Sequence, residues 1–235
     1  MAISLSIITI NYNNSEGLEN TLKSLEHTFS QKNYELIVID GSSNDNSLEI
    51  CNKYISGIDI LVTETDNGIF DAMNKGVKLA NGEWLFFLNS GDVLYELDIN
   101  NFNFSPFVNY NIIYGDVLHI RKNSTYRLVC DHEVGKINHQ GLLYRRVIHK
   151  QYGLYNSNRK FKVADYFFFK QVPINLFIKL NIIFSKAQPG GYSESVNILN
   201  HRNDVDYFLD KISLINFLIK KLTYSIWWIV RKMFR

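Results

Sequence analysis

Two short polar segments, each directly after an apolar run, carry the residues of this sequence that are best suited to chemistry. Asp40 follows the run 36–39 and begins a turn rich in glycine and hydroxyl groups. The run 85–88 leads into the segment Asn-Ser-Gly-Asp at 89–92. Because ligands of α/β sheets bind beyond the carboxyl ends of the strands, Asp40 and Asp92 are expected to face one bound molecule. The same residue types cap helices and close turns, so a purely structural interpretation stays open.

The elements that must position these segments alternate between strand and helix in the first part of the chain. Short β-branched and apolar runs predict strands, and leucines spaced by a helical turn predict helices. The expected strands are 4–10, 34–40, 59–63 and 84–88, and the expected helices are 16–29, 48–54 and 69–80. This alternation indicates an α/β fold with a doubly wound, mostly parallel sheet.

After residue 92 the alternation weakens. The expected elements are strands at 111–119, 125–130, 139–147 and 180–185 and a helix at 164–170. This smaller region is suited to receive a second substrate.

Composition sets limits on the class of protein. With 235 residues, of which 46% are hydrophobic, the chain can bury a core. The formal net charge of +2 does not indicate a nucleic-acid binder. Cys51 and Cys130 have no CxxC or Cys/His spacing, so neither a disulfide framework nor a zinc site is expected. The first residues lack a basic leader region, which predicts no signal peptide and a cytoplasmic location.

The last segment, 212–235, combines apolar residues, two tryptophans among them, with basic ones. From Lys211 to the end the chain holds Lys and Arg residues and no acid. Lys220 and Lys221 interrupt the apolar run, which disfavours a helix that spans a membrane. The pattern favours a basic amphipathic helix that lies on an anionic membrane surface. A helix packed on the domain or on another subunit is the alternative.

Four motifs, taken in their order, resemble those of glycosyltransferase family 2. They read Ser-Ile-Ile-Thr-Ile-Asn-Tyr-Asn at 6–13, Ile-Asp-Gly-Ser-Ser-Asn-Asp at 39–45, Asp-Asn-Gly-Ile-Phe-Asp-Ala-Met-Asn-Lys-Gly at 66–76 and Gly-Glu-Trp-Leu-Phe-Phe-Leu-Asn-Ser-Gly-Asp at 82–92. The third is similar to the bacterial branch that assembles O-antigen and capsule repeat units. The resemblance covers roughly residues 4–195.

The resemblance implies a GT-A fold, a nucleotide-sugar donor, expected to be a UDP-sugar, and a divalent metal, Mn²⁺ or Mg²⁺. It implies that the sugar is transferred with inversion at the anomeric carbon. It divides the chain into a glycosyltransferase domain over 1–205 and the basic amphipathic segment 206–235. Within the domain, 1–95 is the nucleotide-sugar half and 96–205 the acceptor half.

The resemblance also implies roles for single residues. The residues expected beside the donor are Thr9, Asn11, Asp40, Asp66, Asn74, Lys75, Asn89, Ser90 and Gly91. Asp92 is expected to bind the metal, although 89–92 holds one acid where the family usually has several. Asp165 matches the catalytic base, and the residues expected beside the acceptor are Asp116, His139 and Gln140. Helix capping remains the alternative for Asp92 and Asp165.

We therefore expect an enzyme that adds one sugar to a lipid-linked or oligosaccharide acceptor for a bacterial surface polysaccharide. It would lie on the inner face of the cell membrane through 212–235 and bind no nucleic acid, and it could form a homodimer. One alternative is a non-catalytic sugar-binding protein on the same fold. A nucleotidyltransferase is disfavoured, because 11–15 holds no glycine and no base to bind a triphosphate.

Overall fold

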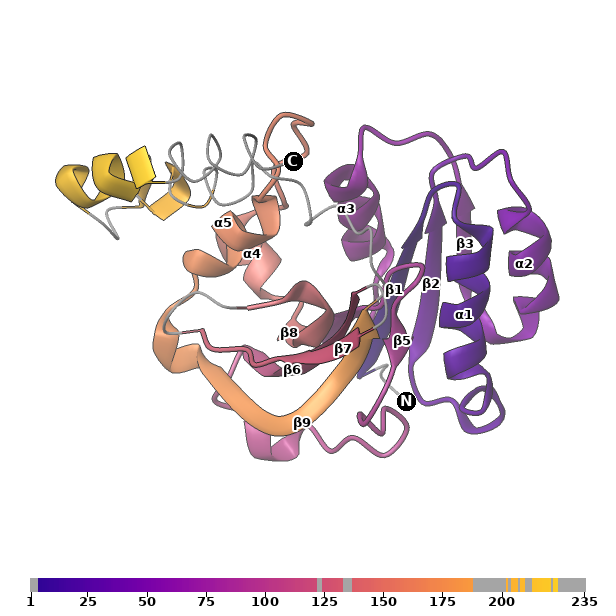
Figure 1. Cartoon of the computed structure of the whole chain (residues 1–235). Coiled ribbons are helices and arrows are strands. Elements are labelled where there is room, and N and C mark those ends of the chain that lie inside the picture. The colour runs from indigo at the N-terminus through magenta and orange to yellow at the C-terminus, as the bar shows by residue number, and fades with distance from the viewer. Residues whose placement is uncertain are drawn as a thin grey trace.

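Strands and helices alternate through the first half of the chain in the computed structural model (Figure 1). The structure describes residues 4–121, 124–132 and 137–187, together with 202, 204–206, 208–209, 213–220 and 222–223 near the C-terminus. The first elements are β1 (Leu5–Asn11), α1 (Ser15–Glu26), β2 (Glu35–Asp40), α2 (Ser47–Lys53), β3 (Ile60–Thr63), α3 (Ile69–Leu79) and β4 (Trp84–Phe87). The predicted α/β class is confirmed.

The second half is richer in strands than in helices. Its elements are β5 (Val93–Leu94), β6 (Ile112–Arg121), β7 (Ser124–Leu128), β8 (Leu142–Arg145), α4 (Ile148–Tyr152), α5 (Ala164–Lys170) and β9 (Phe177–Ala187). The predicted strand 139–147 is wrong at both ends. His139–Gly141 form a 3₁₀ turn, because the Asn138 side chain accepts a hydrogen bond from the Gln140 N–H at 3.2 Å, and α4 begins at Ile148.

One sheet runs through both halves. Among the described residues its nine strands follow the order β3-β2-β1-β4-β8-β6-β9-β5, and β7 pairs with β6. The pairs β1–β2, β1–β4, β2–β3 and β6–β9 are parallel, whereas β4–β8, β6–β8, β6–β7 and β5–β9 are antiparallel. The carboxyl ends of β1, β2 and β4 therefore lie at one edge of the sheet.

Helices cover both faces of the sheet in its first half. Figure 1 shows α1 and α2 on one side of β1–β3 and α3 on the other. Every residue of β1 and β2 is buried, as expected for central strands covered on both faces. The core accordingly has two parts: α3, α4 and α5 pack on one face, and α1, α2 and the segment 97–107 pack on the other.

The C-terminal segment 212–235 is described in part. Residues 214–220 are helical. Five large apolar residues in 214–222 expose between 52% and 70% of their surface: Leu214, Ile215, Leu218, Ile219 and Leu222. In the part of the chain that the structure describes, no helix has the length and apolar character needed to cross a membrane.

Candidate active site

The carboxyl ends of β1 and β2 are joined by a buried network of hydrogen bonds. Asn11 and Asp40 are register partners at the ends of the two strands, and Asn11 Nδ2 donates to Asp40 Oδ2 at 2.7 Å. The turn after β2 also binds this carboxylate, since the Ser43 N–H and hydroxyl donate to Asp40 at 2.8 and 2.6 Å. Asp40 is thus a fully buried carboxylate that fixes the shape of its own turn.

Two predicted donor residues on β1 have different environments. Thr9 Oγ1 donates to the Leu88 carbonyl at 2.9 Å and so ties β1 to the end of β4. Asn11 Oδ1 is buried and has no hydrogen-bond partner among the described residues. Because a buried acceptor is seldom left unpaired, Asn11 Oδ1 is a point where a ligand could donate a hydrogen bond.

Tyr12, Gly41 and Asp66 lie close together beyond the carboxyl ends of β1 and β2. A Cβ atom on Gly41 would lie 2.6 Å from Asp66 Oδ2 and 3.1 Å from Tyr12 Cδ2, so a larger residue at position 41 would require these side chains to shift. Tyr12 exposes 65% of its surface, which leaves an aromatic ring open beside a carboxylate. Tyr12 is not among the residues predicted from the sequence to contact the donor. The signal that could have found it is an aromatic residue directly after a buried strand.

Asn74 and Lys75 bind protein groups. Asn74 holds the backbone of Tyr155: its Nδ2 donates to the Tyr155 carbonyl at 2.8 Å, and its Oδ1 accepts from the Tyr155 N–H at 2.9 Å. Lys75 Nζ lies 2.9 Å from Glu64 Oε1 and donates to the Thr65 carbonyl at 2.7 Å. Both residues therefore order the walls of the site, and a contact with the donor remains a prediction.

The loop 89–92 packs against α1. Thr21 Oγ1 donates to the Asp92 carbonyl at 2.7 Å, and Ser90 Oγ accepts from Asn14 Nδ2 at 2.8 Å. Gly91 has φ +99°, a conformation that favours glycine. These contacts fix the loop beside the carboxyl end of β1, where the Ser90 N–H donates to the Ile10 carbonyl at 3.1 Å.

The side-chain oxygens of this loop are suited to coordinate a divalent cation that a bound substrate also coordinates. Among the described residues no three His, Cys, Asp or Glu side chains gather as a complete metal site. Asn89 Oδ1 is nevertheless buried without a hydrogen-bond partner in the described part of the chain, and Asp92 is buried three residues later. Mg²⁺ commonly uses one or two carboxylates together with substrate phosphates, so an amide oxygen and one carboxylate are a reasonable protein share.

Asp165 lies beside His139, and both sit near the end of β4. The distance from His139 Nδ1 to Asp165 Oδ2 is 3.8 Å, and the Phe87 and His139 ring centroids are 4.9 Å apart. The Asp165 side chain is 35% exposed at the start of α5 and accepts the Tyr166 N–H at 2.8 Å. Burial by itself would raise the pKa of Asp165, but the His139 ring and this N–H outweigh burial and lower it. Asp165 is therefore an ionised carboxylate that solvent can reach.

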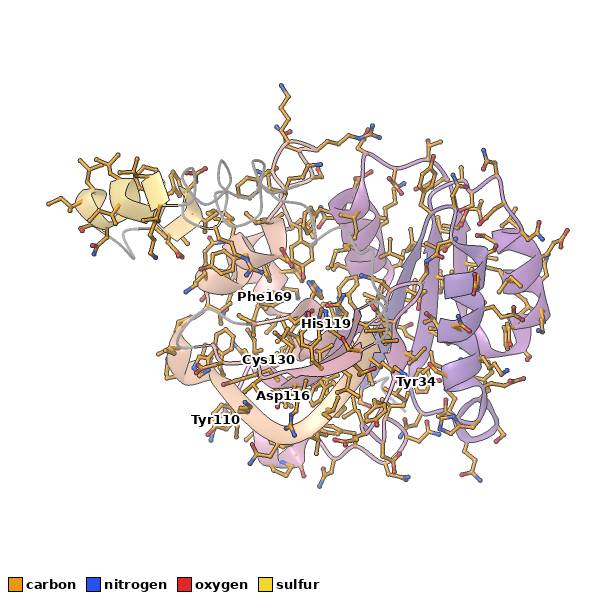
Figure 2. All side chains as sticks on the ribbon, in the orientation of Figure 1. Tyr34, Tyr110, Asp116, His119, Cys130 and Phe169 are labelled. Atoms are coloured by element: carbon orange, nitrogen blue, oxygen red, sulfur yellow. The ribbon has the colours of Figure 1, made fainter. Side chains whose placement is uncertain are left out.

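Asp116 lies on β6 between two irregularities in its pairing with β9, a feature common next to active sites. It is buried, and its carboxylate lies 2.6 Å from Arg127 Nη2 and 3.2 Å from Lys179 Nζ. Figure 2 places Asp116 and Cys130 together on the β6–β9 side of the molecule. Burial raises the pKa of Asp116, but the Cys130 N–H and the two cations reverse this and lower it.

Gln140 lies in the 3₁₀ turn at the same edge as Asp116. The hydroxyl of buried Ser185 donates to the Gln140 carbonyl at 2.7 Å, which ties the turn to β9. The predicted acceptor residues are thus brought near the carboxyl end of β4, and their contact with an acceptor remains a prediction.

Comparisons with known proteins agree with this arrangement. The model of glycosyl transferase family 2 matches residues 6–102, which include the strand ends described above. A "PGL/p-HBAD biosynthesis glycosyltransferase" of Mycobacterium bovis is 36% identical over 136 residues, covering 52% of this chain and 52% of the relative. Residues 6–102 thus match glycosyl transferase family 2, the family that the sequence motifs resemble.

A second curated relative matches a shorter part of the chain. The "Poly(ribitol-phosphate) beta-N-acetylglucosaminyltransferase TarP" of Staphylococcus aureus is 34% identical over 116 residues, covering 47% of this chain and 36% of the relative. The chain spans about half the length, or less, of the curated relatives that it matches.

Solved structures confirm the predicted GT-A fold of the domain. S. aureus TarS, solved as residues 1–349 in complex with UDP-GlcNAc, gives a TM-score of 0.69 at 16% identity and covers 87% of this chain and 66% of that one. A mannosyltransferase from Pyrobaculum calidifontis, solved with GDP-Man and Mn²⁺, gives a TM-score of 0.64 at 13% identity, covering 89% and 64%. At these identities the likeness concerns the fold.

Proposed function

We propose that this chain is an inverting glycosyltransferase that moves one sugar from a UDP-sugar to a hydroxyl of a saccharide acceptor. The observation that carries the proposal is the common edge of the sheet. Asn11 Oδ1, which has no hydrogen-bond partner among the described residues, and the open Tyr12 ring lie at the end of β1, and the ionised Asp165 faces His139 near the end of β4. This arrangement supports a nucleotide site and a proton acceptor at the edge where α/β sheets bind their ligands.

In the proposed donor site the uridine stacks on the Tyr12 ring. The Asn11 and Asp66 oxygens accept hydrogen bonds from the nucleoside, and the buried Asp40 holds the turn that forms the pocket floor. Base stacking on an exposed aromatic ring contributes about 1–3 kcal/mol. The loop 89–92 then lies beside the diphosphate.

In the proposed reaction Asp165 accepts the proton of the acceptor hydroxyl. The hydroxyl oxygen forms a bond to the anomeric carbon, and the bond from that carbon to the phosphate oxygen breaks, with its electron pair leaving on the diphosphate. Attack from the side opposite the leaving group inverts the anomeric configuration. Asn89 and Asp92 would hold a Mn²⁺ or Mg²⁺ ion, which supplies neutralisation of the diphosphate charge when bound.

The names of the relatives support a role in cell-surface glycan synthesis. One relative is named for PGL/p-HBAD biosynthesis and another for poly(ribitol-phosphate) modification, and TarS was solved with UDP-GlcNAc. We extend this to a bacterial surface polysaccharide, with O-antigen and capsule repeat units as the acceptors that the sequence motifs favour.

Attachment to the inner face of the cell membrane is part of the proposal. Residues 214–220 form a helix that exposes apolar side chains, and the chain from Lys211 onward holds bases and no acid. An apolar face beside cations suits an anionic lipid surface, where a lipid-linked acceptor also lies.

A donor screen tests the proposed function. Purified protein is incubated with a panel of UDP-sugars and GDP-mannose, with Mn²⁺, Mg²⁺ or EDTA, and release of nucleoside diphosphate is measured. Metal-dependent release from one UDP-sugar is the expected result. If no donor is cleaved but UDP binds by calorimetry, the non-catalytic alternative is correct, and if nothing binds, the donor site is misassigned.

A further inference from the structure

His139 sits in a box of aromatic rings instead of on the open edge of the sheet. Its ring centroid lies 4.9 Å from that of Phe87, 5.5 Å from Phe169, 5.8 Å from Tyr155 and 6.3 Å from Tyr144. Its side chain is only 8% exposed. An acceptor sugar in solution therefore cannot reach most of this imidazole, although the sequence motif places it on the acceptor side.

The two ring nitrogens of His139 have opposite environments. Nε2 is buried and has no hydrogen-bond partner among the described residues, whereas Nδ1 faces Asp165 Oδ2 at 3.8 Å. A proton on Nε2 would leave a buried donor unpaired and turn the Nδ1 lone pair toward a carboxylate. Nε2 lacks a partner in the described part of the chain in either tautomer, but a proton on Nδ1 faces the carboxylate, so the neutral ring is assigned its hydrogen on Nδ1.

We infer that His139 is a positioning residue, whose Nδ1–H faces Asp165 and fixes the orientation of that carboxylate toward the acceptor hydroxyl. This rests on the proposed function, in which Asp165 is the base. In this inference His139 acts through Asp165 and not, as the sequence motif predicted, on the acceptor, because the aromatic rings enclose most of its ring. At 3.8 Å the two atoms are farther apart than in a hydrogen bond, and contacts of catalytic groups often shorten to hydrogen bonds only when the substrate is bound.

The structure identifies the other groups that act on Asp165. The Tyr166 N–H donates to it from α5, and the charge of Arg202, whose guanidinium lies 5.0 Å from the Tyr166 ring centroid, lowers its pKa further. The phenol of Tyr155, in the loop before α5, stays neutral, because burial raises its pKa well above the usual value. Of these groups only His139 is both rigidly enclosed and aimed at the carboxylate from the β4 side.

Three variants separate this role from a structural one. His139→Phe keeps a ring in the aromatic box and removes both nitrogens. His139→Asn places an amide N–H at the δ position, where Nδ1 is. His149→Phe is the matched control, since His149 is also a buried imidazole among these rings but bonds Tyr144 Oη at 3.1 Å and the Gly153 carbonyl at 2.9 Å.

The first readout does not need activity. The Asp165 carboxyl carbon is followed by ¹³C NMR through a pH titration, with Asp165→Asn used to assign its signal. The expected result is a higher Asp165 pKa in His139→Phe, because a partner that favours the ionised carboxylate is lost, and an unchanged Asp165 pKa in His149→Phe. Equal titration in wild type and His139→Phe would overturn the inference.

The second readout is the pH dependence of sugar transfer. The acid limb of kcat/KM should move to higher pH in His139→Phe and return toward wild type in His139→Asn, with donor KM unchanged. An acid limb that moves equally in His149→Phe would show a merely structural effect and refute the assignment. If the NMR shift is found but wild type transfers no sugar, the proposed function fails while the pairing of His139 with Asp165 stands.

Discussion

Asn74 offers the clearest separation of a structural role from a donor-binding role. The family motif places it beside the donor, but both polar atoms of its side chain bond the Tyr155 backbone, at 2.8 and 2.9 Å. Tyr155 is buried, and its ring packs against Phe168, Phe169 and the proposed positioning residue His139. We predict that Asn74→Ala destabilises the fold and leaves nucleotide affinity nearly unchanged.

The magnitude follows from the two backbone groups that the change leaves unpaired. Each buried N–H or carbonyl that loses its partner costs about 1–3 kcal/mol, so the change costs about 2–6 kcal/mol before relaxation. For a domain of this size 1 kcal/mol corresponds to about 2–4 °C in Tm, so Tm should fall by about 10 °C.

The assay pairs thermal unfolding with calorimetric titration of UDP at a temperature where both proteins are folded. Asn67→Ala is the matched control, because Asn67 is an exposed asparagine near the start of the same helix. An unchanged Tm together with a UDP Kd raised tenfold would refute the reasoning and restore Asn74 to the donor site.

Three further outcomes are expected. Tyr12→Ala should weaken UDP binding about tenfold without lowering Tm, since it removes an exposed stacking surface; unchanged affinity in calorimetry would exclude the stacking model. Glu35→Gln should lower Tm at pH 7. Burial alone would raise the pKa of Glu35, but hydrogen bonds from Ser6, Asn81 and Gly82 lower it, so the wild-type advantage should shrink as pH falls below about 4, and a constant advantage would contradict this. Leu218→Asp should reduce co-sedimentation with anionic vesicles and leave donor cleavage intact, whereas unchanged sedimentation would favour a protein partner for the helix.

Three strands of the first half, β1, β2 and β4, were predictable because each is a buried run bounded by polar turns, and β3 is a short, partly buried apolar run. The second half was less so. The residues 139–141 read as a strand continuous with β8, yet the side chain of Asn138 caps them into a 3₁₀ turn, a local contact that periodicity does not reveal. The two-residue strand β5 exists only through its pairing with β9.

The candidate site shows the same division. Asp40 and Asp92 could be selected from residue type and their places after strands, and Asp165 from its match to the family's catalytic position at the start of a helix. The roles of Asn74 and His139 could not be predicted from the sequence, because they depend on contacts with Tyr155 and Asp165, which lie far away in the sequence. Motifs predict which residues matter, whereas three-dimensional contacts decide what each one does.

The central claim is that Asp165 deprotonates an acceptor at an edge where the nucleotide binds independently of it. The most direct test compares wild type with Asp165→Asn for UDP affinity and for the rate of sugar transfer from the donor found in the screen. Removal of a general base typically costs about 10²–10⁴ in rate, so we predict a kcat loss of that order with a UDP Kd within about twofold of wild type. A transfer rate that Asp165→Asn leaves intact would contradict the account.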